Sequence, residues 1–388
     1  MPRTLVVTND FPPRRGGIET FVHALTEALP PGEVVVYTAR MPGHAAVDAA
    51  LPFPVVRDPA QTLLPLPSVA RRTAQVLRSA GCDRVLFGAA APLGLLAPAL
   101  RKAGAQRIVA LTHGHETWWA KTPGTRSALR RIAAGADTLT FVSRWCRDQI
   151  AAALPAATAQ RMRRLSPGVD TQRFRPGCGG AAVRERLGIA AERPVVVCAA
   201  RMVARKGQDT LVRGWRQVLS VEPDALLLFV GDGPHCKRVA QLAAAEGVTR
   251  SVVFAGSVPW SQVAAYLDAG NVFAMPCRTR LGGLEPEALG IVFLEAAACA
   301  LPVVVGNSGG APETVLPGRT GHLVDPLDPA AAAGTLAGLL TDPALARQMG
   351  RRGRAWVESA WTWSAAGARL RDLLDGAAVD DETAEAPR

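Results

Sequence analysis

Short runs of Val, Leu and Ile alternate with longer stretches rich in Ala, Arg and Leu along most of the chain. A parallel strand covered on both faces appears as a short, continuous apolar run, and the stretches between the runs have the length and composition of helices. Strands are therefore predicted at Leu5–Thr8, Val34–Tyr37, Arg84–Phe87, Ile108–Leu111, Thr138–Val142, Val195–Ala199, Ala225–Val230, Val252–Ala255, Val272–Met275 and Val303–Gly306. Strands that alternate with helices in this way predict doubly wound parallel α/β sheets.

The predicted strands form two consecutive sets, and a stretch rich in Pro and Gly between Ser166 and Gly180 separates them. A chain of 388 residues is long enough for two domains that each bury a core. We predict two Rossmann-like domains facing a central cleft, with the first over residues 1–170 and the second over 176–360. Each sheet is expected to have about five or six strands, with the carboxyl ends of both sheets lining the cleft.

The positive charge of the chain is concentrated in its first half. Residues 1–175 contain 23 Lys and Arg against 11 Asp and Glu, a net charge of +12, whereas residues 176–388 have a net charge of −1. Such polarity favours an anionic partner for the first half, either a lipid surface or nucleic acid, and solubility alone is a further explanation. Aromatic residues interleaved with arginines for base stacking are largely absent, which disfavours nucleic acid.

A tryptophan pair precedes a cluster of arginines in this basic half. Trp118 and Trp119 come just before a predicted helix at 126–134 that carries Arg126, Arg130 and Arg131. Trp and Arg together suit the headgroup layer of a membrane, although a solvated basic face beside a core Trp has the same composition.

The chain contains no evident targeting or metal-binding pattern. Its N-terminus reads as a first strand without the architecture of a signal peptide, and the longest uncharged run, Phe87–Leu100, is too short to span a bilayer. The seven cysteines form neither a CxxC pair nor a metal-like spacing with histidine, so we expect reduced thiols in a cytoplasmic protein and no metal. The acidic tail at 379–388 lacks an apolar pattern and is predicted to be disordered.

Residues 287–295 place two carboxylates on either side of a Gly-Ile-Val turn that opens a helix of small residues. A glycine at a helix entry lets a ligand approach the free backbone N–H groups, and the helix dipole favours an anion there. A diphosphate at Gly290, Ile291 and Val292 would leave Glu287 on the loop side and Glu295 about one turn inside the helix. One carboxylate could then hold a sugar and the other a ribose. A helix entry with a capping carboxylate and a buried, paired Glu has the same spacing.

Adjacent glycines, Gly16 and Gly17, follow the first predicted strand and open a helix. Neither has a side chain to block the backbone N–H groups, so this loop suits the approach of a phosphate or a sugar. The loop does not match the GxGxxG pattern of dinucleotide-binding proteins, and a tight turn without a ligand remains an alternative.

Two other strand ends carry candidate chemistry. His113 and His115, in Thr-His-Gly-His-Glu, lie where a ring could bond a sugar hydroxyl or a phosphate, although each histidine taken alone favours a structural role at the rim over a catalytic one. Their spacing without a third ligand is weak for zinc.

Arg201 and Lys206 follow another strand and could clamp a diphosphate from two sides, or form a solvated basic loop. Val258 closes a further strand, where its backbone could contact a base.

Taken together, these segments resemble the retaining glycosyltransferases of family 4, which have the GT-B fold. The double-glycine loop, the Thr-His-Gly loop, the Gly-Val-Asp linker, the Arg and Lys pair and the Glu-x7-Glu block occur in the family's order along almost the whole chain. Within the family, the chain is similar to the actinobacterial phosphatidylinositol mannosyltransferases, in particular those that add the second mannose. The similar stretches are residues 9–14, 87–93, 112–116, 205–209, 273–276 and 308–315.

The resemblance implies a role for each candidate residue. Glu287 would hold the hydroxyls of the donor sugar and Glu295 the ribose, while His113 would stand over the reacting sugar. Asp10 and His115 would lie on the acceptor side. The remaining donor contacts would come from Gly16 and Gly17 near the phosphate and sugar, from Arg201, Lys206 and the amides of Gly290, Ile291 and Val292 at the diphosphate, and from the backbone of Val258 at guanine.

The implied activity is transfer of α-mannose from GDP-mannose to a phosphatidylinositol mannoside on the anionic inner-membrane surface, without a metal or other cofactor and without nucleic acid. A sister enzyme that uses UDP-glucose or another acceptor is an alternative, and a non-catalytic binder of anionic surfaces or nucleic acid is a second. The resemblance also implies that a final helix at about 361–374 packs on the first domain. Leu281 departs from the family, because a third glycine is expected before Gly282 and Gly283.

Overall fold

The structure is a computed structural model that describes residues 2–14 and 16–378. The chain divides into two compact units. Unit 1 comprises Met1–Gly168 with Trp363–Arg388, and unit 2 comprises Val169–Thr362. The tail at 379–388, which we predict to be disordered, lies outside the described residues.

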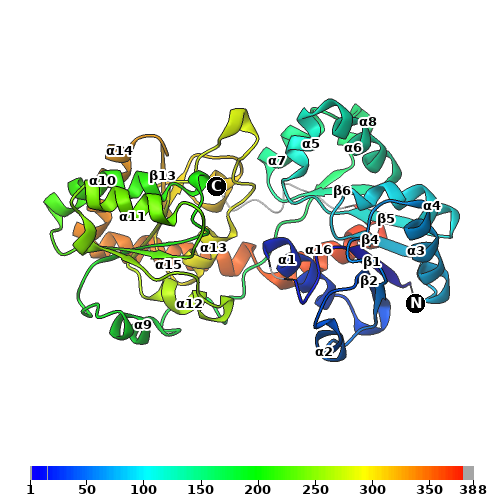
Figure 1. The fold of residues 1–388 in the computed structure, drawn as a ribbon, viewed down its shortest axis with the longest axis horizontal. Helices are drawn as coiled ribbons and strands as arrows, with labels where there is room; N and C mark the ends of the chain where they lie inside the picture. The colour runs from blue at the N-terminus through cyan, green and yellow to red at the C-terminus, as the bar shows by residue number, and fades with distance from the viewer. Residues whose placement is uncertain (1, 15, 379–388) are drawn as a thin grey trace. The chain divides into compact units, whose positions relative to one another are not determined.

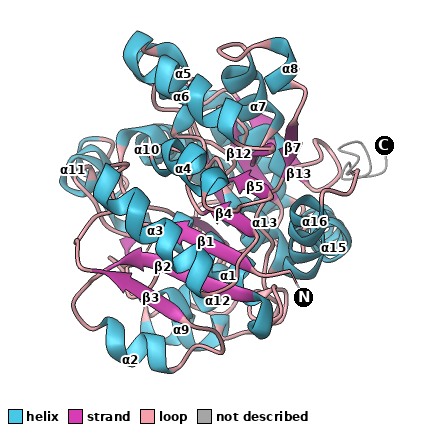
Figure 2. Cartoon of the chain, turned by 90° about the vertical axis from the view of Figure 1, so that its right-hand side faces the viewer, coloured by secondary structure: helices cyan, strands magenta, loops and turns pink. Residues whose placement is uncertain are grey.

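Unit 1 contains a parallel sheet of seven strands in the order β3-β2-β1-β4-β5-β6-β7. Strands β3, β2, β1, β4 and β5 follow one another in Figure 2. The strands are β1 (Thr4–Thr8), β2 (Val34–Ala39), β3 (Val55–Asp58), β4 (Arg84–Phe87), β5 (Arg107–Ala110), β6 (Thr138–Phe141) and β7 (Met162–Arg164). The helices are α1 (Gly17–Glu27), α2 (His44–Ala49), α3 (Pro67–Ser79), α4 (Ala97–Lys102), α5 (Glu116–Lys121), α6 (Pro123–Gly135), α7 (Arg144–Ala151), α8 (Ala156–Ala159) and α16 (Trp363–Asp375), with short 3-10 turns η1 (Pro31–Glu33) and η2 (Leu93–Leu96).

Unit 2 contains a parallel sheet of six strands in the order β10-β9-β8-β11-β12-β13. The strands are β8 (Val195–Ala199), β9 (Leu226–Val230), β10 (Val252–Phe254), β11 (Val272–Met275), β12 (Val303–Gly306) and β13 (Gly321–Val324). The helices are α9 (Gly180–Arg186), α10 (Gln208–Val221), α11 (Cys236–Ala245), α12 (Trp260–Asp268), α13 (Ile291–Ala298), α14 (Pro329–Thr341) and α15 (Pro343–Ala360), with 3-10 turns η3 (Ala204–Lys206), η4 (Thr249–Ser251), η5 (Leu281–Gly283) and η6 (Ala311–Thr314).

The strand order of each sheet identifies where a ligand site is expected. In unit 1 the order reverses between β1 and β4, and in unit 2 it reverses between β8 and β11. Loops that leave neighbouring strands in opposite directions open a crevice at their carboxyl ends, where doubly wound folds bind ligands. The double glycine follows β1, and Arg201 and Lys206 follow β8. Both sets therefore lie beside the points where the strand order reverses, called the switch points below.

All the strands predicted from continuous apolar runs are present, with ends that differ from the prediction by at most two residues. The prediction lacked β3, β7 and β13, each of which lies at the edge of its sheet. An edge strand is covered less completely and does not need a continuous apolar run; the sequence of β7 is Met-Arg-Arg. Unit 1 therefore has seven strands, more than the five or six expected.

The final helix, α16, belongs to unit 1 and packs on α1 and β5. Its first residue, Trp363, lies 6.0 Å from Phe21 of α1 between ring centres. Gly367 allows close approach, since a Cβ there would lie 2.5 Å from the Cβ of Ala28. Apolar residues on one face, including Leu370 and Leu373, are buried. The chain therefore returns to unit 1 after completing unit 2.

Candidate active site

Glu287 is the centre of a charged cluster at the switch point of unit 2. Its Oε2 accepts hydrogen bonds from Nη1 of Arg205 at 2.7 Å and from Nζ of Lys206 at 2.6 Å. The carboxylate is buried, with the residue 8% exposed. Burial alone would raise the pKa of Glu287, but the charges of Lys206 and Arg205 and their hydrogen bonds bring it below its usual value. Glu287 is therefore ionised and fixed in place.

The loop after β12 holds the backbone of Glu287. The amide of Gly310 donates to the Glu287 carbonyl at 2.9 Å, and Oγ of Ser308 accepts from the Glu287 amide at 3.3 Å. Gly309 has a left-handed φ of 56°, and a Cβ there would lie 2.1 Å from the Glu287 carbonyl oxygen. Only glycine fits this position. The Ser-Gly-Gly stretch at 308–310 thus positions the first carboxylate of the Glu-x7-Glu block.

Gly290 forms the entry to α13. Its φ is 83°, and a Cβ would lie 2.7 Å from the ring of Phe293. The first amides of a helix have no partner within it, so Ile291 and Val292 present free N–H groups beside the glycine. Glu295 lies one turn further along and is partly buried. Burial raises the pKa of Glu295 to about 7, and the charge of Arg173 acts in the opposite direction.

Arg201 and Lys206 have different surroundings at the end of β8. Lys206 bonds to Glu287, whereas Arg201 is exposed and makes no ion pair with the carboxylates of residues 2–14 and 16–378. Arg201 lines an open hollow of about 470 Å³ with Arg205 and six other residues, namely Val203, Ala204, Pro234, His235, Arg280 and Glu285. Sequence reasoning missed Arg205 as a partner of Glu287, although its place next to Lys206 was a usable signal.

Val258 lies on the loop between β10 and α12 and is partly exposed. Within this loop the carbonyl of Gly256 accepts from the amide of Gly231 at 2.8 Å, so the segments after β9 and β10 are tied together. This places the Val258 backbone at the carboxyl edge of the sheet that carries Lys206 and Glu287.

Leu281, the predicted departure from the family, adopts the conformation that a glycine favours. Its φ is 50°, and its side chain is 61% exposed. A left-handed conformation costs an L-residue about 1–2 kcal/mol. The loop before Gly282 and Gly283 therefore keeps the backbone of a glycine turn, with an exposed apolar side chain added.

The loop after β1 in unit 1 is organised by Arg14. Its Nε lies 2.9 Å from Oε1 of Glu19, and its Nη1 lies 3.8 Å from Oδ1 of Asp10. Gly16 and Gly17 are exposed at the start of α1, and a Cβ on Gly16 would lie 2.3 Å from the Glu19 carboxylate. The double glycine therefore leaves the helix entry open while Glu19 fills the space beside it.

His113 is held at the end of β5 with its ring partly buried. Its Nε2 lies 2.6 Å from the carbonyl oxygen of Gly88, so Nε2 carries the proton and Nδ1 is left as an acceptor. Burial lowers the pKa of His113, and the charge of Glu116 opposes this effect only in part. The ring is therefore neutral. Phe21 packs against the ring edge-on at 5.6 Å, and His115 stacks on it at 6.5 Å. The structure therefore brings both predicted histidines together.

The tryptophan and arginine cluster lies on α5 and α6, which are neighbours in the sequence and in space (Figure 1). Trp118 is 41% exposed, whereas Trp119 packs on the core. Nε of Arg126 donates to the carbonyl of Ala120 at 2.8 Å, and Nε of Arg130 donates to that of Ala153 at 2.7 Å. Arg126 therefore ties α6 to α5, whereas Arg130, which is exposed, ties α6 to the segment after α7.

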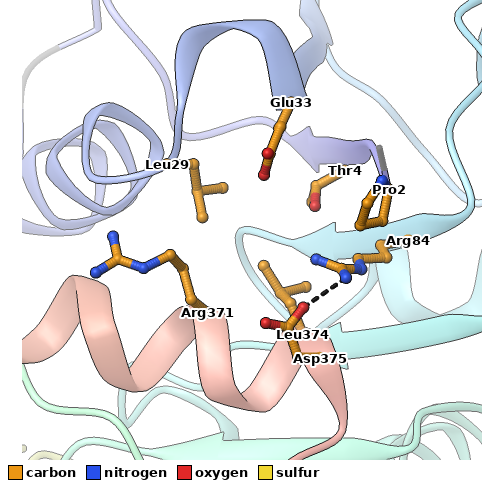
Figure 3. A pocket seen from close by; sticks show the side chains of 8 residues that line it. All are labelled: Pro2, Thr4, Leu29, Glu33, Arg84, Arg371, Leu374 and Asp375. Carbon is orange, nitrogen blue, oxygen red and sulfur yellow. Dashed lines mark ion pairs between the residues drawn. The ribbon is translucent and has the colours of Figure 1, made fainter.

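A second hollow lies at the opposite end of the unit 1 sheet, where β1 and β4 begin (Figure 3). It has a volume of about 250 Å³, and an ion pair of 2.5 Å between Arg84 and Asp375 crosses it. Nη1 of Arg371 donates to the carbonyl of Ala28 at 2.8 Å. These contacts attach α16 to β4 and to the end of α1, and no sequence pattern indicated the hollow.

Neither a metal centre nor a membrane span is found in the part of the chain that the structure describes. Across residues 2–14 and 16–378, no three His, Cys, Asp or Glu side chains are grouped so that they could hold a metal ion. The helices in the same ranges are too short or too polar to cross a bilayer.

Two family descriptions match this chain. "Glycosyltransferase Family 4" matches residues 15–173, and "Glycosyl transferases group 1" matches residues 181–356. Anabaena HepE in complex with UDP has the same fold, with a TM-score of 0.80 at 19% identity over 97% of this chain and 100% of that one.

Curated relatives match over nearly the full length. The GDP-mannose-dependent alpha-(1-6)-phosphatidylinositol monomannoside mannosyltransferase of Mycolicibacterium smegmatis is 47% identical over 96% of this chain and 98% of its own. The corresponding enzyme of Corynebacterium glutamicum, named for a monoacylated monomannoside, is 41% identical over 96% of this chain and 97% of its own. The chain therefore belongs to the retaining glycosyltransferases of family 4, with the GT-B fold, and groups with the actinobacterial phosphatidylinositol mannosyltransferases.

Proposed function

We infer that the chain is a GDP-mannose-dependent mannosyltransferase that transfers α-mannose to a phosphatidylinositol mannoside. The relatives of near full length support the donor and the acceptor. The structural observation that carries the proposal is the environment of Glu287. One oxygen of its carboxylate, Oε2, accepts hydrogen bonds from both Arg205 and Lys206 beside the open entry of α13. This arrangement suits a ligand with both a diphosphate and sugar hydroxyls.

The donor is proposed to engage unit 2 through two kinds of group. Lys206, Arg201 and the amides of Gly290, Ile291 and Val292 would bear the charge of the diphosphate. Glu287 would accept hydrogen bonds from the mannose hydroxyls. A second carboxylate, Glu295, would take the ribose, and the Val258 backbone would contact guanine.

The proposed reaction proceeds on the face of the sugar from which the phosphate departs. The oxygen of an acceptor hydroxyl bonds to the anomeric carbon as the bond from that carbon to the phosphate oxygen breaks. The hydroxyl proton passes to the departing phosphate, so the products are the mannosylated lipid and GDP. Lys206, Arg201 and the helix amides stabilise the charge that develops on the phosphate. No metal is required in this scheme.

Unit 1 is proposed to supply the acceptor side. Asp10 and His115 would contact the lipid headgroup, while Gly16, Gly17 and neutral His113 would lie near the reacting sugar. The net positive charge of this half would hold the protein peripherally on the anionic cytoplasmic face of the membrane. A flotation assay with vesicles tests this part, and equal binding to neutral and anionic vesicles would contradict it.

The activity is tested by a product assay with purified protein, labelled GDP-mannose and phosphatidylinositol monomannoside. We expect a dimannoside with GDP-mannose, none with UDP-glucose, and no loss in the presence of EDTA. Hydrolysis of GDP-mannose without transfer would support the donor and contradict the acceptor. Neither transfer nor hydrolysis would contradict the mannosyltransferase proposal, and loss of activity with EDTA would contradict its metal-free mechanism.

A further inference from the structure

A stacked pair in unit 2 connects the linker to the loop proposed to contact the base. The guanidinium carbon of Arg173 lies 3.8 Å from the ring centre of Trp260, and Phe174 packs edge-on against the same ring at 6.4 Å. Trp260 begins α12, two residues after Val258, and is 50% exposed. A cation over the face of an indole is attracted to the ring, so Trp260 orients the guanidinium.

The backbone around Arg173 is fixed to the helix that carries Glu295. Oδ1 of Asp170 accepts from the Arg173 amide at 3.0 Å. Nη1 of Arg354 donates to the carbonyl of Phe174 at 3.3 Å and to that of Ala298 at 2.6 Å, which joins the linker to the end of α13. Arg173 is therefore held at a defined place relative to Glu295 rather than on a loose connection.

Arg173 and Glu295 each have unused hydrogen-bonding capacity. Nη1 of Arg173 is buried without a hydrogen-bond partner, and the Glu295 carboxylate makes no hydrogen bond or ion pair with residues 2–14 or 16–378. Buried donors are normally satisfied, so an unpartnered one calls for an explanation. The two groups interact electrostatically without a direct hydrogen bond. A polar ligand with adjacent hydroxyls would satisfy the donor and the acceptor together.

Other charged or titratable groups near α13 are committed elsewhere. Oxygens of Asp268 on α12 accept from the amides of Gly177, Gly179 and Gly180, and Arg354 also pairs with Glu358 of its own helix. Cys299, at the end of α13, forms a side-chain hydrogen bond with Cys178, and Glu313 of η6, which packs on α13, has interactions of its own. Arg173 is the cation whose charge opposes the effect of burial on Glu295.

We propose that Arg173, held against Trp260, is a positioning and specificity residue of the donor site: with Glu295 it brackets the adjacent hydroxyls of the nucleotide ribose. The guanidinium donates to one hydroxyl oxygen, and the charged carboxylate accepts from the hydroxyl protons. The stack with Trp260 links this bracket to the loop that carries Val258. The inference rests on the proposed use of a nucleotide sugar and adds a determinant of its ribose.

The test compares Arg173→Gln and Arg173→Lys with Arg175→Gln, which removes a neighbouring exposed arginine from the same linker. Each variant is assayed with GDP-mannose and with its 2′-deoxyribose analogue, after thermal unfolding has shown that it is folded. For Arg173→Gln we expect the donor KM to rise about tenfold, kcat to change less than about threefold, and most discrimination against the deoxy donor to disappear. Arg173→Lys keeps part of the discrimination, and Arg175→Gln matches the wild type.

A pH profile separates this role from a purely structural one. Protonation of Glu295 weakens donor binding, so the wild-type KM rises as the pH falls through about 7. Without the Arg173 charge the pKa of Glu295 is higher, so the rise in KM begins at a higher pH in Arg173→Gln. Unchanged discrimination and an unchanged profile would overturn the inference, even if KM itself increased.

The outcome is distinct from a failure of the proposed activity. If the wild type transferred no mannose, equilibrium binding of GDP and 2′-deoxy-GDP would still test the bracket. A preference for GDP that is lost in Arg173→Gln would support the inference, and equal affinity of the wild type for both nucleotides would overturn it.

Discussion

The two units carry their candidate residues in different ways. In unit 2 the central groups are charged side chains bonded to one another, with Arg205 and Lys206 on one oxygen of Glu287. In unit 1 the central groups are exposed glycines and a neutral His113 whose proton is directed to a backbone carbonyl. Both sets lie at the carboxyl ends of parallel strands, so the same topology supports two kinds of chemistry.

The difference indicates which unit supplies the electrostatic part of catalysis. Charged groups that are fixed before reaction stabilise developing charge without a reorganisation cost. Lys206 and Arg205 are fixed in this way by a buried carboxylate. A neutral ring and an open helix entry offer close approach and hydrogen bonds with little charge. We therefore expect variants in unit 2 to lose more activity than matched variants in unit 1.

Glu287→Gln should have the largest effect. The amide keeps the shape of the side chain but removes the charge that holds two cations and accepts from the sugar. We expect kcat/KM to fall by about 10² to 10³ in a mannosyl transfer assay. Glu192→Gln, an exposed carboxylate before β8, is the matched control and should retain full activity. A loss of less than about threefold for Glu287→Gln would remove Glu287 from the site.

Lys206→Met should reduce kcat/KM by about 10², because one cation at the diphosphate is lost. Arg205 still bonds Glu287 in this variant, so the fold is retained. Arg205→Gln should cost about tenfold, since Lys206 remains in place. Steady-state kinetics measure both variants. If Arg205→Gln proved as harmful as Lys206→Met, the two cations would have the same role.

Gly309→Ala should destabilise the protein by about 2 kcal/mol or more, because its left-handed φ and its contact with the Glu287 carbonyl exclude a Cβ. Gly334→Ala provides the control. That glycine is exposed within α14 and a Cβ there meets nothing within 4 Å, so alanine should stabilise the helix by about 0.5–1 kcal/mol. Denaturant unfolding gives both values, and equal effects at the two positions would contradict the bracing role of Gly309.

His113→Gln in unit 1 should lower kcat by about tenfold, less than the substitutions of Glu287 and Lys206. The depressed pKa of His113 keeps the wild-type ring neutral, so its ionisation should leave kcat unchanged between about pH 6.5 and about pH 8. A pH profile of kcat checks this. A fall in kcat with an apparent pKa near 6.5 that vanished in His113→Gln would show instead that the ring titrates in this range.

Arg84→Gln should have the smallest effect. Its partner Asp375 is about half exposed, and pairs of this kind contribute about 1 kcal/mol or less. We expect a small loss of stability in thermal unfolding, reduced further at high salt, and no change in transfer activity. A large loss of activity would mean that the hollow at the amino ends of β1 and β4 participates in function.

Much of this fold follows from the sequence because buried parallel strands leave continuous apolar runs. The edge strand β7 could not be recognised in the same way, since Met162–Arg164 lacks an apolar run. The spacing of the Glu-x7-Glu block indicated a candidate site, although a capped helix entry has the same spacing. The pairing of Arg205 with Glu287 was not, because the residues lie 82 positions apart and meet only when β8 and β11 become neighbours. The bracing by Gly309 likewise depends on a tertiary contact.

The most direct test is an equilibrium titration of the full-length wild type and Glu287→Gln with GDP and with GDP-mannose. If Glu287 holds the sugar and the cations hold the diphosphate, the substitution should weaken GDP-mannose by about tenfold or more and change GDP by less than about threefold. Equal weakening of both ligands would show that Glu287 acts only by arranging Lys206 and Arg205, and would contradict the proposed division between sugar and diphosphate.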